Sequence, residues 1–203
     1  MSATNRSAAR EAHPNDFFET PAWCTKAILP LLPSANVLDP CAGSGAILRA
    51  VRDEYPDALV SGYEINDALT ALSHEHGLSV ETRDALGLDP WRAADVILMN
   101  PPFALAEEFV RRALAEAQPT AWVVALLRVN WIASIKRMAF HRAHPADLYI
   151  LPRRPSFTGK GTDACEYAWF VWRRFAGGRW QILEIPIEAA PRALRAVKAQ
   201  VTR

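Results

Sequence analysis

From residue 36 onward, short apolar runs alternate with amphipathic stretches, and this alternation constrains the fold more than any other feature. Apolar runs bounded by turn residues predict buried strands, and amphipathic stretches of roughly 10–15 residues predict helices that cover them. Strands that alternate with helices form βαβ units, which build a parallel sheet with helices on both faces. We therefore expect an α/β fold with a mostly parallel central sheet of about seven strands.

The expected strands are 37–38, 59–65, 78–81, 96–99, 121–127, 148–151 and 167–172, and the expected helices are 46–54, 67–76 and 104–117. Gly177-Gly178 separates 167–174 from 180–185, which predicts an antiparallel hairpin at the C-terminal edge. A short basic helix is expected over 192–201. Residues 1–15 are small and polar, which predicts a flexible N-terminal segment before one domain over 16–203.

The composition excludes several classes of protein. Half of the 203 residues are hydrophobic and 22% are charged, which is typical of a globular chain and not of a disordered one. No apolar run approaches the ~20 residues that span a bilayer, and the N-terminus lacks the apolar core of a secretory signal. Three cysteines without a CxxC pair support neither a disulfide framework nor a zinc site. We expect a cytoplasmic protein with no membrane segment and no metal.

The charge is distributed unevenly along the chain. The net charge is +1, but residues 128–160 contain seven Lys/Arg and one acid, Asp147, a local balance of +6 that leaves −5 for the remainder. Such a basic segment is typical either of a face for an anionic partner or of a solvated surface.

The first expected strand ends in a glycine-containing loop, Asp39-Pro40-Cys41-Ala42-Gly43-Ser44-Gly45. In open α/β sheets, ligands bind beyond the carboxyl ends of the strands. Glycines let the backbone approach a ligand closely. The loop lacks the Lys of a phosphate-binding P-loop and is not a full GxGxxG. The carboxylate of Asp39 suits a cationic or hydroxyl-bearing ligand.

Two further acids follow the next two expected strands. Glu64 ends the second strand about 20 residues beyond the glycine loop, where an acid accepts both hydroxyls of a ribose. Asp84, after the third strand, either accepts from the exocyclic amine of an adenine or caps a turn.

The fourth expected strand ends in Asn100-Pro101-Pro102-Phe103. Two consecutive prolines fix two φ angles and remove two N–H donors, so the carbonyl oxygens beside Asn100 have no local competition. Phe103 offers a flat face on which a planar substrate can stack. Arriving after the glycine loop and the two acids, this turn predicts a catalytic site.

With these motifs the chain resembles the Rossmann-like S-adenosylmethionine-dependent methyltransferases, and among them the N6-adenine DNA methyltransferases. Phe17-Phe18-Glu19-Thr20-Pro21 is similar to the N-terminal cofactor motif of that family, and Asn100–Phe103 to its catalytic tetrapeptide. The resemblance covers about residues 16–175. It implies S-adenosylmethionine as cofactor, Asn100, Pro101, Pro102 and Phe103 as catalytic residues, and a cofactor site made of Phe18, Thr20, Pro21, Asp39, Cys41, Ala42, Gly43, Gly45, Glu64, Ile65, Asp84, Ala85 and Asn100.

The resemblance also implies how the reaction proceeds. An exocyclic amine is a poor nucleophile because its lone pair is delocalised, and the Asn100 side-chain oxygen and the Pro101 carbonyl are placed to bind its two hydrogens. The remaining catalysis is positioning for in-line displacement, without a metal. A base in duplex DNA must be flipped out and stacked on aromatic side chains. The residues expected to hold the nucleic acid are Phe103, Trp131, Lys136, Arg137, Arg153, Arg154, Phe157 and Lys160.

Alternatives remain open at this point. Restriction-type enzymes of the family usually have a separate target-recognition domain, and residues 176–203 are too few for one. Phe at the end of the tetrapeptide is also common in enzymes resembling ribosomal RNA base methyltransferases, so RNA adenine N6 or guanine N2 is a second substrate class. A protein glutamine amide is less favoured, because the relevant enzymes have Tyr at that position. A non-catalytic nucleic-acid-binding partner is disfavoured by the intact motifs.

Overall fold

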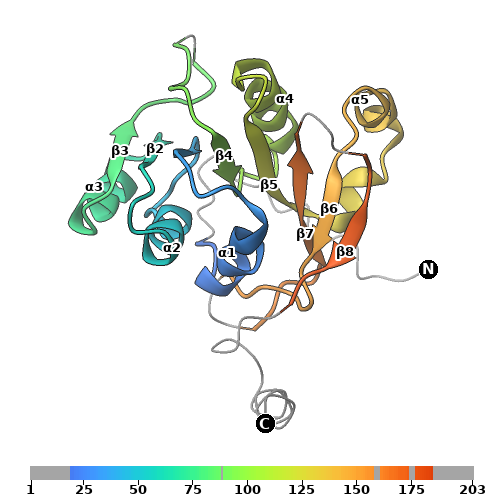
Figure 1. Cartoon of the computed structure of the whole chain (residues 1–203), viewed down its shortest axis with the longest axis horizontal. Helices are drawn as coiled ribbons and strands as arrows, with labels where there is room; N and C mark the ends of the chain where they lie inside the picture. The colour runs from blue at the N-terminus through green and yellow to red at the C-terminus, as the bar shows by residue number, and fades with distance from the viewer. Residues whose placement is uncertain (1–18, 88, 158–160, 174–176, 185–203) are drawn as a thin grey trace, which may run out of the picture.

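The computed structural model describes residues 19–87, 89–157, 161–173 and 177–184 (Figure 1). The strands are β1 (Val37–Asp39), β2 (Val60–Glu64), β3 (Ser79–Thr82), β4 (Val96–Met99), β5 (Trp122–Arg128), β6 (Asp147–Ile150), β7 (Tyr167–Trp172) and β8 (Trp180–Ile182). The α-helices are α1 (Ala22–Ile28), α2 (Ala46–Glu54), α3 (Asp67–Glu75), α4 (Ala106–Glu116) and α5 (Met138–Ala143).

These strands form one sheet in the order β3-β2-β1-β4-β5-β7-β6-β8, so that β3 and β8 are its edges (Figure 1). The pairs from β3 to β5 are all parallel, whereas β7 pairs antiparallel with both β5 and β6. The expected α/β fold with a mostly parallel sheet is therefore confirmed. The carboxyl ends of β1, β2 and β4, which carry the polar motifs, lie at one edge of the sheet because neighbouring parallel strands end together.

The C-terminal edge differs in one detail from the expectation. The antiparallel pair there is formed by β6 and β7, and the proposed pairing of 167–174 with 180–185 was wrong, because β8 pairs in parallel with β6. The side chain of Asp147, at the start of β6, explains this arrangement. Its carboxylate accepts hydrogen bonds from the backbone amides of Gly177 and Arg179 and from the guanidinium groups of Arg173 and Arg179. The turn before β8 is thereby fixed to β6.

Alternating side chains along the central strands pack on opposite faces of the sheet. On β4, Val96 and Leu98 join a core with α1 and α2, whereas Ile97 and Met99 join a core with α4 and α5. The four residues of β4 are buried, as expected for a central parallel strand covered on both sides.

Several elements were not expected. Helix α1, helix α5 and the short 3-10 helices Val129–Ile132 and Ile135–Arg137 precede or follow strands in segments whose apolar spacing is too short for a clear helical period. The expected flexible segment 1–15 and the expected helix 192–201 lie outside the described residues. No helix in the described ranges combines the length and apolar character needed to cross a bilayer.

Replacing Asp147 by Asn is expected to lower the free energy of unfolding by about 2–4 kcal/mol at pH 7, since it removes one partner of a buried ionic cluster. Burial alone would raise the pKa of Asp147, but the hydrogen bonds from Arg179, Gly177 and Arg173 lower it to about 2. The stability that this carboxylate contributes is present above the unfolded pKa of about 3.9 and is lost as the pH falls through about 2. Chemical denaturation at pH 7 and pH 3 measures the difference between variant and wild type, which should be smaller at pH 3. An equal difference at both pH values would contradict the ionic role.

Candidate active site

A cavity of about 370 Å³ lies at the carboxyl ends of β1, β2 and β4. Its volume falls in the range of small-molecule and cofactor sites. The motifs that the sequence places after separate strands meet here: the cavity is lined by Pro40, Cys41, Gly43, Glu64, Ile65, Asn66, Leu69, Arg83, Asp84, Ala85, Leu86, Asn100, Pro101, Pro102, Phe103, Leu105, Glu108 and Phe109.

The glycine loop wraps closely around the end of β2. Gly43 and Gly45 have φ angles of +54° and +82°, a left-handed conformation that favours glycine. A side chain on Gly62 of β2 would place its Cβ 2.8 Å from the Cβ of Ala42 and 2.9 Å from the carbonyl oxygen of Asp39. The absence of a side chain at Gly62 therefore allows the loop to lie directly against β2, next to Glu64.

Glu64 holds the loop and borders the cavity at the same time. One carboxylate oxygen accepts from the Gly43 amide at 2.8 Å and the other from the Asn66 amide at 2.9 Å. Each oxygen can accept a second hydrogen bond, so the carboxylate retains the capacity to bind two ligand hydroxyls. The Asn66 side chain caps α3 by accepting from the amides of Ala68 and Leu69.

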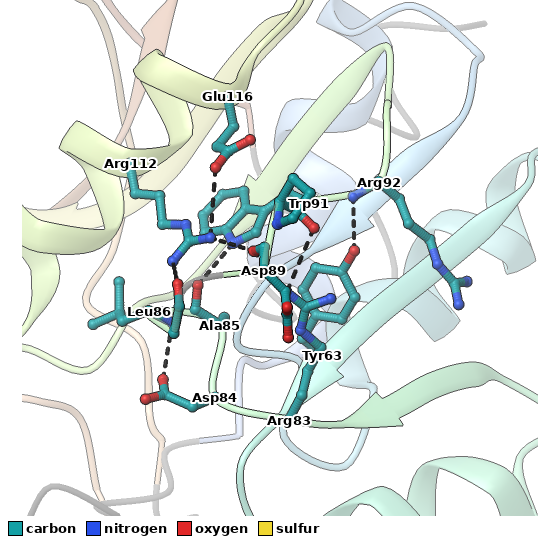
Figure 2. A network of polar contacts seen from close by, with 12 residues as sticks. Tyr63, Arg83, Asp84, Ala85, Leu86, Asp89, Trp91, Arg92, Arg112 and Glu116 are labelled. Carbon is teal, nitrogen blue, oxygen red and sulfur yellow. Dashed lines mark hydrogen bonds and ion pairs between the residues drawn. The ribbon is translucent and has the colours of Figure 1, made fainter.

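The wall after β3 is a loop fixed by aromatic and arginine side chains (Figure 2). The indole of Trp91 donates to the carbonyl of Ala85 at 2.7 Å, and the Tyr63 hydroxyl accepts from the Arg92 amide at 2.7 Å. Figure 2 shows Arg112 reaching from α4 to this loop, where its guanidinium donates to the carbonyls of residues 87 and 89.

Asp84 lies on the exposed part of this wall. One oxygen of its carboxylate accepts from the Leu86 amide at 2.8 Å, so the turn-capping reading of Asp84 is correct. The same side chain also borders the cavity, which keeps it available as an acceptor for an exocyclic amine.

Asn100, at the end of β4, is oriented by a residue 80 positions away. Its amide nitrogen donates to the Thr20 hydroxyl at 2.9 Å, and this bond directs the amide oxygen to the other side of the group. Thr20 is 4% exposed and borders a second cavity of about 590 Å³ together with Pro21 and Phe157. The structure thus brings Thr20 to the Asn100–Phe103 turn instead of to the wall of the first cavity.

Phe103 and Phe157, the aromatic residues expected to stack on a substrate, both pack against the buried Tyr167. The ring centroids of Phe103 and Phe157 are 6.1 Å and 5.1 Å from that of Tyr167. The guanidinium of Arg128 lies over the Phe103 ring at 4.2 Å. Arg128 was not among the expected site residues, because nothing in the sequence distinguishes it from the other basic residues of 128–160.

The basic residues expected to bind the substrate do not gather in one place and instead make separate contacts. Lys136 is exposed, Arg137 donates to the carbonyl of Trp131 at 2.9 Å, Arg153 stacks over Trp23 at 4.6 Å, and Arg154 pairs with Glu166 at 2.7 Å. Phe18 and Lys160 lie outside the described residues.

Trp131 is 8% exposed and lies in the core instead of on the cavity wall. It packs edge-on against Phe140, Phe170 and Trp172, at centroid distances of 5.9, 5.6 and 6.3 Å. We therefore leave Trp131 out of the proposed substrate site.

Of the expected cofactor residues, Asp39, Ala42 and Gly45 shape the loop from beneath and do not line the cavity. The Asp39 carboxylate is 1% exposed and accepts from the Cys41 amide at 3.0 Å. Burial raises the pKa of Asp39 to about 7, although the hydrogen bonds from Cys41 oppose this effect. Among the described residues, no cluster of His, Cys, Asp and Glu has the arrangement of a metal site.

Because its folded pKa is raised, Asp39 contributes a stabilisation that is complete below the unfolded pKa of about 3.9 and is lost as the pH rises through about 7. Asp39→Asn keeps an oxygen for the Cys41 amide and removes the charge. Between pH 5 and pH 8, the unfolding free energy of the variant should therefore gain about 2–3 kcal/mol relative to wild type. Denaturation curves at several pH values measure this gain. The exposed Asp57→Asn is the control, and a pH-independent difference for Asp39→Asn would refute the assignment.

No protein-family model matches this chain, and no curated protein sequence matches it. Among solved structures, it is similar to a proposed class I S-adenosylmethionine-dependent methyltransferase from Listeria monocytogenes. That similarity has a TM-score of 0.62 and 13% identity, and covers 89% of this chain and 67% of that chain.

Two further solved structures are similar. One is a modification subunit of a proposed type I restriction enzyme from Vibrio vulnificus (TM-score 0.60, 18% identity, 89% of this chain and 49% of that chain). The other is a proposed RNA methyltransferase from Pyrococcus horikoshii (TM-score 0.57, 14% identity, 78% of this chain and 85% of that chain). The chain spans about half of the restriction subunit. At these identities the similarity shows the fold, which is that of the class I methyltransferases.

Proposed function

We propose that this protein is an S-adenosylmethionine-dependent N-methyltransferase that acts on the exocyclic amine of adenine in DNA. The observation that carries the proposal is that Asn100–Phe103 forms one wall of the cavity whose other walls are the glycine loop and Glu64. The methyltransferase fold supports the reaction type, and the tetrapeptide supports an acceptor nitrogen in a planar group.

The residues that line the cavity fit a nucleoside cofactor. Glu64 has acceptor capacity for two ribose hydroxyls and Asp84 has it for an adenine amine. Ile65 and Ala85 add apolar surface to the same lining. When bound, S-adenosylmethionine supplies an electrophilic methyl group attached to a positively charged sulfur. Cys41 and Gly43 of the glycine loop also border the cavity, and the Gly43 amide donates to Glu64.

Asn100 and Pro101 prepare the acceptor nitrogen. The Asn100 amide oxygen and the Pro101 carbonyl each accept one hydrogen of the amine, which localises the lone pair that forms the new bond to carbon. The cofactor held by Glu64 and Asp84 would supply the methyl group and keep the electrons of the broken carbon–sulfur bond, and the methylated nitrogen would lose one proton to water. Phe103 supplies a face for the base, and the fixed geometry lowers the barrier through positioning and electrostatics.

The basic segment 128–160 supports a nucleic-acid substrate. Its one acid, Asp147, is bound by Arg173 and Arg179 and is 1% exposed, so it does not offset the positive charge of the surface. Lys136, Arg142 and Arg153 are exposed. Such side chains neutralise phosphates, and the binding that they provide weakens as salt is added.

Methyl transfer from labelled cofactor tests the proposal directly. The protein is incubated in parallel with unmethylated genomic DNA, with total RNA and with ribosomes, and each product is digested to nucleosides and identified by mass. We expect label in N6-methyladenine from DNA and none with an Asn100→Ala variant. Label confined to RNA would mean that the substrate is RNA and not DNA. The similarity to the Pyrococcus protein supports this second candidate. No transfer to any nucleic acid would refute the proposal.

A further inference from the structure

Phe103, the last residue of the catalytic tetrapeptide, is covered on its ring by the side chain of Arg128. The guanidinium carbon lies 4.2 Å from the ring centroid, which is a short cation–π distance. Arg128 ends β5, next to β4 in the sheet, and is half-buried. A guanidinium is planar and can stack flat on an aromatic ring, whereas an ammonium cannot.

Arg128 is itself held by a chain of hydrogen bonds that leads into the loop before β7. Its Nε donates to the Tyr167 hydroxyl at 3.2 Å, and that hydroxyl donates to Asp163 at 3.0 Å. A hydroxyl has one proton, so a Tyr167 that donates to Asp163 accepts from Arg128. Burial raises the pKa of Tyr167, which keeps this proton in place.

The far end of this series of hydrogen bonds holds the segment that carries Phe157. The other oxygen of Asp163 accepts from the Cys165 amide at 3.0 Å, and the Asp163 amide donates to the Pro155 carbonyl at 2.8 Å. Tyr167 also packs directly on Phe157. One connected set of contacts therefore joins residues 155–157 and 161–165 to the Phe103 ring.

We infer that Arg128 is a positioning residue, which holds the Phe103 ring in place for the acceptor base and couples it to the Asp163 loop through Tyr167. The inference rests on the proposed function for the identity of the acceptor. Arg128 does not line the cofactor cavity. Loss of the Arg128 side chain should therefore lower activity toward the acceptor and leave the affinity for the cofactor unchanged.

Three variants separate the components of this arrangement. Arg128→Met keeps the length of the side chain and removes both the charge and the planar group, and Arg128→Lys keeps only the charge. Tyr167→Phe keeps the ring that packs on Phe103 and Phe157 and removes the hydroxyl. Arg111→Met is the matched control, because Arg111 makes a similar contact over Phe140 at 4.7 Å outside the cavity.

Two measurements are made on each variant. The first is kcat/KM for the acceptor nucleic acid, together with cofactor affinity by calorimetry. We expect Arg128→Met to lower kcat/KM by about 10- to 100-fold, as a displaced positioning group does, with cofactor affinity unchanged. Arg128→Lys should be impaired to a similar degree and Tyr167→Phe to a smaller one. Arg111→Met should match wild type.

The second measurement is hydrogen exchange in the peptide that covers residues 103–110, which needs no substrate. Exchange there should be faster in Arg128→Met and Tyr167→Phe than in wild type and in Arg111→Met. If wild type methylates no nucleic acid, the proposed function fails, but this arm still judges the role of Arg128. Unchanged exchange in Arg128→Met, full rescue by Lys, or a faster Arg128→Met enzyme would overturn the inference.

Discussion

Asn100→Ala is expected to lower the rate of methyl transfer by about 10²–10³-fold or more, because a preorganised group that contacts the reacting nitrogen is lost. Cofactor affinity should remain nearly unchanged, since the principal cofactor contacts are assigned to Glu64, Asp84 and the glycine loop. Single-turnover kinetics with labelled cofactor measures the transfer step, and calorimetry with S-adenosylhomocysteine measures binding.

Two further variants make the Asn100 result specific. Asn36→Ala removes an exposed asparagine that directly precedes β1, outside the cavity lining, and should behave as wild type. Thr20→Val removes the acceptor that orients the Asn100 amide, and should lower the transfer rate by about tenfold, the effect of one lost hydrogen bond. A large loss of cofactor affinity in Asn100→Ala would contradict the assigned role.

Glu64→Ala is expected to weaken cofactor binding by about 1–3 kcal/mol, which corresponds to roughly 5- to 150-fold in Kd. The loss has two sources. The ligand loses the carboxylate proposed to bind its ribose, and the amides of Gly43 and Asn66 lose their acceptor.

Glu64→Gln separates these two sources, because it keeps an oxygen for a backbone amide and loses the charge and half of the acceptor capacity. We expect it to bind more weakly than wild type and more tightly than Glu64→Ala. Glu81→Ala on the adjacent strand β3 is the control, since Glu81 is exposed and pairs only with Arg92 among the residues of the structure. Wild-type affinity in Glu64→Ala would reject the ribose assignment.

The sequence predicts several strands and helices of this fold well. Strand β4, strand β7 and helix α2 have the expected bounds, because their apolar residues are continuous or strongly periodic and turn residues flank them. The gathering of the glycine loop, Glu64, Asp84 and Asn100 at one cavity follows from topology, since parallel strands deliver their carboxyl ends to one edge.

The remaining features depend on contacts between distant residues. The partner of β8 is decided by Asp147 through hydrogen bonds over about 30 positions, which local patterns do not contain. In the sequence, Trp131 cannot be distinguished from an aromatic residue of a substrate site. Only the packing of the folded protein places it in the core. The orientation of Asn100 by Thr20, and the contact of Arg128 with Phe103, likewise arise only when separate strands and loops meet.

Arg112 belongs to the helix that begins three residues after Phe103, yet its guanidinium is anchored in the loop after β3 that forms another wall of the cavity (Figure 2). The wall proposed to receive the adenine of the cofactor and the helix that follows the proposed catalytic turn are therefore joined through one side chain. We expect exchange of spent for fresh cofactor to occur without a closing segment at that wall. An inhibitor that matches this wall should therefore lose little affinity to the ordering of protein side chains when it binds.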